Sequence, residues 1–330
     1  MIDTPIDSLC SMVTADRALA DVFQRARRVA RTDEAVLILG ETGAGKEGLA
    51  SALHSLSNRR SGPFEAVNCA VLGGELASSE LFGHERGAFT GADRRRVGVF
   101  ERASGGTVFL DEIGELIPGV QGRLLRLLET RKVMRLGGER EVGCDFRLVA
   151  ATHRDLVQDI AEDRFRRDLF YRVGVIVLHI PPLRDRPDDV ELLAGRLLRA
   201  TAPNLRWSRA ATRALRARSW PGNVRELRNV VGRVAALLEG PIIGADDIEA
   251  LEATLPSATA SPRRPSLRTL RPDSGGAGAT EGVQIGGRSL QAIRHDAIRH
   301  ELARQHGNIS QAARILQVAR STIYSAMGTG

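Results

Sequence analysis

A glycine-rich segment, GETGAGKE at residues 40–47, lies between a short apolar run and a helix-like stretch. Its glycines let backbone N–H groups turn towards phosphate oxygens, and the dipole of a helix that begins near Lys46 adds to the attraction. The Lys46 ammonium can reach the β and γ phosphates of a nucleotide, as in the pattern G-x-x-x-x-G-K. A chance glycine-rich turn is the alternative, but the flanking elements favour a nucleotide-binding loop. The residues expected to contact the nucleotide are Gly40, Glu41, Thr42, Gly43, Ala44, Gly45, Lys46 and Glu47.

Two adjacent acids end a second apolar run, GGTVFLDE at residues 105–112. Asp111, at the carboxyl end of the expected strand, can hold Mg²⁺ directly or through water, and Glu112 can polarise an attacking water. Glu47 stands where the general phosphate-loop pattern has a Ser or Thr that holds magnesium. Adjacent acids alone are a weak signal, but these follow the glycine-rich segment on another expected strand. The combination predicts hydrolysis of a nucleotide phosphate.

The pattern between residues 35 and 180 predicts the scaffold that positions these segments. Short β-branched apolar runs alternate with helix-like stretches, which favours a parallel α/β sheet with right-handed crossovers. Residues 188–251 have apolar residues at spacings of three and four, which predicts a small helical domain. Residues 254–288 are rich in Pro, Ser, Gly, Ala and Arg, as in a linker, and a short helical unit follows at residues 289–327. The five expected strands are AVLIL (35–39), FEAVN (64–68), TVFLD (107–111), FRLVAAT (146–152) and VIVLHI (175–180).

The chain has 330 residues, 42% hydrophobic and 26% charged, which fits a globular protein of about two domains. Its apolar runs fall far short of the roughly 20 residues of a membrane helix, and Asp3 and Asp7 stand where a signal peptide would be basic. Cys10, Cys69 and Cys144 are an odd number without CxxC spacing, which argues against a disulfide framework or a cysteine zinc site. We therefore expect a cytoplasmic protein with no membrane partner.

The net charge of +7 is concentrated near the C-terminus. Residues 261–330 carry ten arginines and four acids, whereas the first 260 residues are nearly neutral. A basic segment behind a neutral body is typical of an electrostatic handle for nucleic acid, and a solvated basic tail is the alternative.

A further segment, ELFGHERGAFTGA at residues 80–92, places Phe89 and Thr90 between glycines. Glycines permit a mobile tip, and an exposed aromatic ring there would be costly without a partner; a β-turn with a buried Phe is the alternative. With the motifs above, over about residues 10–250 and the C-terminal helical unit, the sequence resembles the AAA+ activators of sigma-54 RNA polymerase, the NtrC class of bacterial enhancer-binding proteins. The resemblance implies that a GAFTGA loop touches sigma-54. This loop is Gly87, Ala88, Phe89, Thr90, Gly91 and Ala92.

The resemblance also implies roles for residues around the phosphates. Asn68 in FEAVNC matches the family's switch residue, which is thought to hold the catalytic glutamate until the nucleotide state changes. ATHRDL at residues 151–156 matches the sensor I segment, in which Thr152 agrees with the family and His153 replaces the usual Asn. Both Thr152 and His153 are therefore candidate nucleotide contacts.

Three arginines match family positions that act on the nucleotide from outside the α/β sheet. RFRRDLFYRV at residues 164–173 resembles a segment whose two arginines act across the subunit interface, which makes Arg166 and Arg172 the candidate arginine fingers. Arg167 stands where the family commonly has Glu. WPGNVREL at residues 220–227 matches sensor II and places Arg225 near the phosphates.

The C-terminal segment NISQAARILQVARSTIYSAM, residues 308–327, has the pattern of a helix, a short turn and a second helix. It resembles the Fis-type DNA-binding domain common in the family, and a helix at about residues 290–305 would supply dimer contacts. After Tyr324 the family usually continues with a basic run, whereas this chain has SAMGTG. A helical hairpin without DNA affinity is the alternative. The outward set expected to meet DNA is Arg320, Ser321, Thr322, Tyr324 and Ser325.

The expected organisation has five parts. They are a short N-terminal extension (1–15), an AAA+ α/β ATPase subdomain (16–183), an AAA+ helical lid subdomain (184–253), a flexible linker (254–288) and a Fis-type helix-turn-helix domain (289–330). The N-terminal extension is too short for a receiver or sensor domain, so we expect control by a separate regulatory protein acting in trans.

The resemblance implies an ATPase that uses ATP and Mg²⁺ and forms a hexamer when active and a dimer when inactive. It would remodel the closed promoter complex of sigma-54 RNA polymerase while bound to upstream enhancer DNA. One alternative is a DNA-binding regulator with a vestigial ATPase, or an inactive partner in a mixed assembly, which His153 and the C-terminal departure favour. Another is a general AAA+ remodeller of other proteins, which leaves the GAFTGA segment unexplained.

Overall fold

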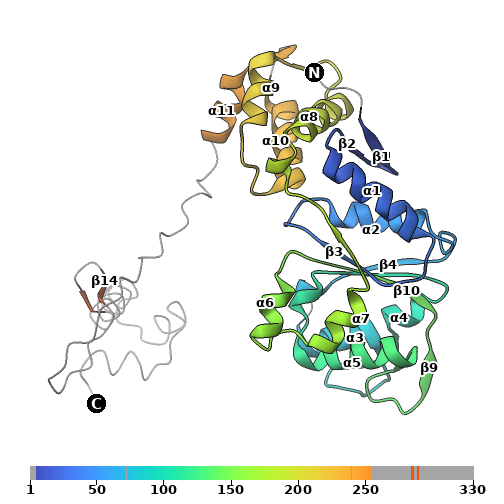
Figure 1. Cartoon of the computed structure of the whole chain (residues 1–330). Coiled ribbons are helices and arrows are strands. Elements are labelled where there is room, and N and C mark those ends of the chain that lie inside the picture. Colours follow the sequence, from blue (N-terminus) through green and yellow to red (C-terminus); the bar gives the residue numbers. More distant parts are fainter. Residues whose placement is uncertain (1–4, 72, 239, 254–283, 286–287, 290–330) are drawn as a thin grey trace, which may run out of the picture. The chain divides into compact units, whose positions relative to one another are not determined.

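The computed structural model describes residues 5–71, 73–238, 240–253, 284–285 and 288–289 (Figure 1). The chain forms two units, residues 1–261 and 262–330. In the second unit, β14 (Gln284–Ile285) pairs antiparallel with β15 (Arg288–Ser289). The other residues expected to form the linker and the DNA-binding unit lie outside the described residues, including Arg320, Ser321, Thr322, Tyr324 and Ser325.

A five-stranded parallel sheet forms the centre of the first unit. It coincides with the five predicted apolar runs to within one residue at each strand end, so the predicted parallel α/β sheet is confirmed. The strands lie in the order β11 (Ile176–His179), β3 (Val36–Leu39), β10 (Phe146–Thr152), β7 (Gly106–Asp111) and β4 (Phe64–Asn68).

Side chains of the strands pack into two hydrophobic clusters, one on each face of the sheet. In β3, Val36 and Ile38 pack into one cluster and Leu37 into the other. Because successive side chains of a strand point to opposite faces, a strand covered on both faces is apolar throughout. The first face is covered by α1 (Arg17–Ala30) and α2 (Lys46–Ser55), and the second by α3 (Gly74–Phe82), α4 (Val99–Arg102), α5 (Pro118–Thr130), α6 (Leu156–Ala161) and α7 (Arg167–Val173) (Figure 1).

A helical subdomain follows the sheet and has its own core. Both tryptophans of the chain, Trp207 and Trp220, are buried in that core. Their indole N–H groups donate to the carbonyl oxygens of Ala194 (3.1 Å) and Leu215 (2.9 Å), which satisfies them away from water. The elements are α8 (Pro187–Thr201), β12 (Arg206–Trp207), α9 (Arg209–Arg216), α10 (Asn223–Leu237), β13 (Ile242–Ile243) and α11 (Ala245–Ala253).

Short antiparallel ladders, which the sequence pattern does not indicate, flank the sheet. β1 (Asp7–Leu9) and β2 (Met12–Thr14) form a hairpin within the expected N-terminal extension. Leu9 is buried in the cluster under α1, and Asp7 pairs with Arg27 of that helix (2.6 Å). The remaining short elements are β5 (Gly83–His84) with β6 (Arg96–Val97), β8 (Lys132–Met134) with β9 (Glu141–Gly143), and the 3₁₀ turns at Cys69–Val71, Ile113–Glu115 and Leu183–Asp185.

The three cysteines are free, with Cys10 exposed and Cys69 and Cys144 buried. Burial raises the pKa of the Cys69 thiol to about 12, and the charges of Asp111 and Glu112 add to the shift, so this thiol stays protonated. Within the described ranges, the helices lack the combination of length and hydrophobicity needed to cross a lipid bilayer.

Candidate active site

A cavity of about 630 Å³ lies where the glycine-rich segment, the carboxyl ends of β4 and β7, the β1–β2 hairpin and the helical subdomain meet. Parallel strands bring their carboxyl ends to one edge of the sheet, which is why distant segments reach a single site. The hairpin, whose part sequence reasoning missed, contributes Ser11, Met12 and Val13 to the lining. Ten expected site residues line the cavity, namely Thr42, Gly43, Ala44, Gly45, Lys46, Glu47, Asn68, Asp111, Glu112 and Arg225.

The glycine-rich segment turns sharply at Gly43 and Gly45, whose φ angles are +77° and +112°. Two features exclude a side chain at Gly43. One is its positive φ, and the other is that a Cβ would lie 2.3 Å from the carbonyl oxygen of Gly222. No side chain caps α2 at Gly45, so the first N–H groups of this helix are left for a ligand. The local backbone therefore suits an anion.

Lys46 is the first residue of α2 and only 6% exposed. Its Nζ donates to the carbonyl oxygens of Gly40 (2.9 Å) and Glu41 (3.3 Å), and it lies 3.4 Å from Glu112 Oε1. A buried ammonium needs such partners. Phosphate oxygens could replace each of them, so the lysine is poised at the anion-binding end of the cavity.

The two acids at the end of β7 differ in their electrostatics. Burial raises the pKa of Asp111, and the charge of Glu112 adds to this effect. Burial also opposes ionisation of Glu112, but the hydrogen bonds from His153 and the Lys46 charge outweigh it, so the pKa of Glu112 is lowered. Glu112 is therefore the firmly ionised member of the pair.

Asp111 is the candidate ligand for a metal ion. Within the part of the chain that the structure describes, no three His, Cys, Asp or Glu side chains gather into a metal site. Mg²⁺ commonly takes only one or two carboxylates and completes its shell with phosphate oxygens and water. The single carboxylate of Asp111 beside the anion-binding backbone fits that mode of binding.

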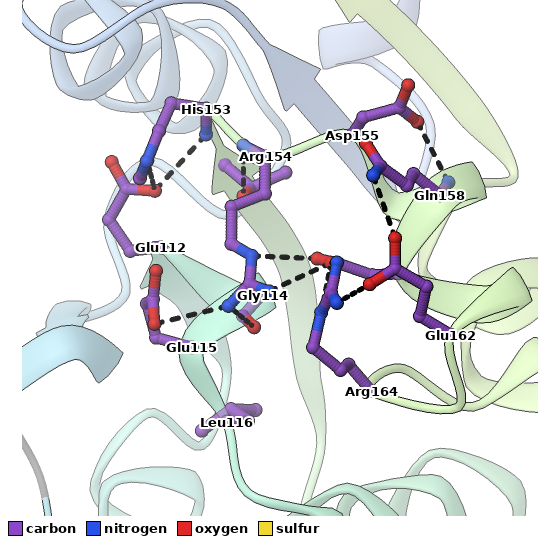
Figure 2. A network of polar contacts seen from close by, with 12 residues as sticks. Glu112, Gly114, Glu115, Leu116, His153, Arg154, Asp155, Gln158, Glu162 and Arg164 are labelled. Atoms are coloured by element: carbon purple, nitrogen blue, oxygen red, sulfur yellow. Dashed lines mark hydrogen bonds and ion pairs between the residues drawn. The ribbon is translucent and has the colours of Figure 1, made fainter. Parts of the chain in front are cut away.

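His153, the residue that follows β10, holds Glu112 through hydrogen bonds (Figure 2). Glu112 Oε2 accepts hydrogen bonds from the backbone N of His153 (3.1 Å) and from its ring Nδ1 (2.6 Å). Asn68 lines the same cavity, but its side-chain oxygen accepts from the backbone N of Ala70 (2.9 Å). Thr152 is buried, and its hydroxyl accepts from the backbone N of Arg154 (3.1 Å).

The helical subdomain is fastened to the glycine-rich segment by Asn223, which sequence reasoning missed. Asn223 Nδ2 donates to Glu41 Oε2 (3.0 Å) and to the carbonyl oxygen of Thr42 (3.1 Å). The backbone N of Val224 donates to the carbonyl oxygen of Gly43 (3.1 Å), and Arg184 pairs with Glu41 (2.8 Å). A signal was present in the Gly-Asn pair of WPGNVREL, because Asn tolerates the φ of +52° found here.

A second buried joint uses Arg186, which also lines the cavity. Arg186 pairs with Asp189 of α8 (3.1 Å), and both side chains are almost completely buried. Asp189 accepts from the Thr14 hydroxyl (2.9 Å) and the Ala15 backbone N (2.6 Å). The pair therefore connects the helical subdomain with the end of the β1–β2 hairpin.

The candidate fingers do not line this cavity. Arg166 directly precedes α7, is half-exposed and pairs with Asp168 (2.7 Å). Arg172, in the last turn of α7, donates to the carbonyl oxygen of Leu128 (3.0 Å). Within one subunit, Arg166 directly before α7 and Arg172 in its last turn both lie outside the cavity that Lys46 lines.

The GAFTGA loop is partly packed. The backbone N of Gly87 donates to the carbonyl oxygen of Ala92 (2.9 Å), and the Phe89 ring meets the His84 ring edge-on at 5.0 Å. Phe89 is thus half-buried, whereas Thr90 is exposed. Gly87 and Gly91 have φ angles of +81° and +97°, so these two glycines are required by conformation.

Three family models match the chain. They are the sigma-54 interaction domain (residues 12–179), the AAA+ ATPase lid domain (184–264) and the Fis family of bacterial regulatory proteins (293–328). The first covers about half of the chain, and with the parallel sheet and the helical lid it confirms the expected AAA+ architecture.

Curated relatives and solved structures agree with this assignment. The regulatory protein AtoC of Escherichia coli (strain K12) is 40% identical over 321 residues, which cover 94% of this chain and 66% of that protein. The transcriptional regulatory protein ZraR of the same strain is 40% identical over 317 residues, 94% of this chain and 67% of that protein. The chain thus spans about two thirds of the length of these relatives.

Among solved structures, NtrX from Brucella abortus in complex with ATP has a TM-score of 0.66 and 30% identity, covering 97% of this chain and 69% of that chain. Its complex with ADP has a TM-score of 0.68. Sequence and structure therefore place the chain in one family: it belongs to the sigma-54 interaction domain family of AAA+ proteins.

Proposed function

We propose that this protein hydrolyses ATP and uses the energy to activate transcription by sigma-54 RNA polymerase. The observation that carries the proposal is that Lys46, at the start of α2, and Glu112, directly after β7, lie 3.4 Å apart in one cavity. A phosphate-binding ammonium beside an ionised carboxylate is the pair that phosphoryl transfer to water requires. The NtrX complexes with ATP and ADP support adenine nucleotides as the ligand class.

Each group has a distinct task in the proposed reaction. Lys46 and the first N–H groups of α2 neutralise the β and γ phosphates, and Arg225 approaches them from the lid. Mg²⁺ bound at Asp111 would add positive charge at the phosphates. Glu112 accepts a proton from, or polarises, the attacking water. The apolar lining at Val13 and Leu193 suits a flat base.

Complete sites would form between subunits in a hexamer, with a dimer as the inactive state. Arg166 and Arg172 lie away from their own cavity and would act as fingers at a neighbouring one. Hydrolysis would move the GAFTGA loop, Gly87 to Ala92, against sigma-54. The match to the sigma-54 interaction domain supports this partner.

The C-terminal segment would bind upstream enhancer DNA. The Fis-family match at residues 293–328 supports DNA binding, with Arg320, Ser321, Thr322, Tyr324 and Ser325 as the proposed contacts. The proposed boundaries are 16–183 for the α/β subdomain, 184–253 for the lid, 254–288 for the linker and 289–330 for the DNA-binding domain. The proposal places this activity in the cytoplasm.

ATP hydrolysis measured against protein concentration tests the enzymatic part. The rate per subunit should rise with concentration, because each site needs a neighbour. Lys46→Ala should weaken nucleotide binding by at least about 10-fold, since it removes the charge that compensates the phosphates. Glu112→Gln should bind nucleotide normally and lose about 100-fold or more in kcat.

Lys132→Ala is the matched control, because Lys132 is the only other lysine and lies exposed on β8, paired with Glu141. It should hydrolyse ATP at the wild-type rate. Normal turnover by Lys46→Ala or by Glu112→Gln would refute the assignment of the site. Nucleotide binding without turnover by the wild-type protein would instead favour a DNA-binding regulator with a vestigial ATPase.

A further inference from the structure

Both carboxylate oxygens of Glu112 are occupied, and by different elements. Oε1 faces Lys46 of α2, 3.4 Å from its Nζ. Oε2 accepts two hydrogen bonds from His153, one from the backbone N at 3.1 Å and one from Nδ1 at 2.6 Å (Figure 2). The glutamate therefore has one oxygen inside the phosphate end of the cavity and the other fixed to the neighbouring strand end.

Sheet register explains why these two residues meet. β7 and β10 are parallel neighbours, with Leu110 opposite Ala150. Glu112 directly follows β7 and His153 directly follows β10, so the two residues leave the sheet at neighbouring strand ends. Glu112 adopts a left-handed backbone with φ of +54°, unusual for a residue with a side chain, and such strain at a site usually serves a function.

The segment that carries His153 is held in place by contacts of the next residue, Arg154. The Arg154 guanidinium donates to the carbonyl oxygen of Gly114 (3.1 Å) and pairs with the buried Asp159 (2.7 Å). Arg164 forms an ion pair with the same carboxylate at 2.6 Å. Figure 2 shows Arg154 reaching from the end of β10 back to Gly114 and Glu115, so the position of His153 is set by neighbours on both sides.

Protonation fixes the direction of the ring hydrogen bond. An ionised carboxylate accepts hydrogen bonds and donates none. As the base of the proposed reaction Glu112 is ionised, so the hydrogen between Nδ1 and Oε2 belongs to His153.

We propose that His153 is the residue that positions Glu112 for catalysis in this chain. It fixes Oε2 so that Oε1 stays directed at the phosphates, and when a nucleotide draws Lys46 to its own oxygens, Oε1 becomes free for the attacking water. In this structure both hydrogen bonds to Glu112 Oε2 come from His153, while the side-chain oxygen of Asn68 accepts from Ala70 N. The inference rests on the proposed ATP hydrolysis.

Steady-state ATP hydrolysis by two His153 variants tests the positioning role. His153→Ala should lower kcat by about 10- to 100-fold, the usual cost of a misplaced reacting group, and change KM by less than about threefold. His153→Asn should recover most of the rate, because the amide nitrogen of Asn can donate from nearly the same place as Nδ1. Gln158→Ala, an exposed residue of α6 in the same segment, should behave as wild type.

A double-mutant cycle separates action through Glu112 from direct contact with the nucleotide. In a Glu112→Gln background, adding His153→Ala should change the remaining rate by less than about twofold, because His153 has no carboxylate left to position. A full additive loss, a large rise in KM, or no recovery in His153→Asn would overturn the proposal.

Histidine ring NMR gives a readout that does not depend on hydrolysis. The ring signal that disappears in His153→Asn should show a protonated Nδ1 in the nucleotide-free protein and should shift in Glu112→Ala. If the wild-type protein shows this signal but does not hydrolyse ATP, the proposed function fails while the contact stands. If Glu112→Ala leaves the ring signal unchanged, the positioning role fails.

Discussion

Individual buried polar residues set how this fold responds to acid. His54 of α2 is 9% exposed, and its Nδ1 lies 3.0 Å from the Thr107 hydroxyl of β7. Burial lowers the pKa of His54 from its ordinary 6.5, and the nearby charge of Arg147 lowers it further. The ring therefore stays neutral in the native state at pH values where the unfolded chain, with the ordinary pKa of 6.5, already protonates it.

The free energy of unfolding should consequently fall as the pH drops below about 6.5, since the unfolded state then binds the extra proton. His54 should contribute a slope approaching about 1.4 kcal/mol per pH unit between its unfolded and folded pKa values. His54→Gln should remove this part of the slope. Urea unfolding followed by circular dichroism at pH 7.5 and about 5.5 measures it, and equal pH dependence of variant and wild type would contradict the assignment.

Residues in contiguous motifs could be predicted from the sequence, and those that depend on contacts between segments could not. Lys46, Asp111 and Glu112 belong to two motifs that lie at the carboxyl ends of predicted strands, so their convergence was predictable. The contact of His153 with Glu112 depends on the register of β7 against β10 and on the backbone at Glu112. The hydrogen bonds from Asn223 to the glycine-rich segment depend on how the lid packs against that segment, and the periodicity of the sequence does not encode this packing.

Among the helices and strands, too, some could be predicted from local sequence and others depend on contacts between segments. The strands at the centre of the sheet were predictable because they are apolar runs covered on both faces, as in β10, where every residue is buried. The edge strands β4 and β11 are only partly buried. The hairpin of β1 and β2 was missed because its strands have three residues each, too few for periodicity to show. Its place beside the cavity comes from tertiary contacts, through Leu9 and Asp189.

The GAFTGA loop gives a prediction about an element. Thr90→Ala and Phe89→Ala should leave ATP hydrolysis within about twofold of wild type, because neither residue lines the nucleotide cavity. Both should abolish promoter opening with sigma-54 polymerase, since this surface is the proposed partner contact. Promoter opening and ATP hydrolysis should be measured on the same preparations.

The two variants also differ in a useful way. Phe89 packs on His84, so Phe89→Ala loses a contact within the subunit, whereas Thr90 is exposed. Loss of promoter opening by Phe89→Ala alone would point to loop packing. Normal activation by both variants would argue against the loop as the sigma-54 contact.

Arg166 and Arg172 should act in the assembled molecule. A finger in trans stabilises the transition state and contributes little to binding by one subunit. Arg166→Ala and Arg172→Ala should each lower hydrolysis by about 10³-fold, with nucleotide binding unchanged. Arg25→Ala, an exposed arginine of α1, is the control and should keep its activity.

Mixed assemblies provide the decisive measurement. Either finger variant mixed with Lys46→Ala should regain activity, because some interfaces then join an intact phosphate loop to an intact finger. No recovery at any mixing ratio would show that the arginines act within their own subunit or only stabilise α7.

The burial of both tryptophans in the lid has an optical consequence. Since Trp207 and Trp220 are the only two in the chain, its intrinsic tryptophan fluorescence comes from the lid, and the sheet and the GAFTGA loop contribute none. Trp220 stands two residues before Gly222, whose carbonyl oxygen lies against the glycine-rich segment at Gly43. The unlabelled protein thus carries a built-in emission probe for the joint between the lid and the phosphate-binding loop.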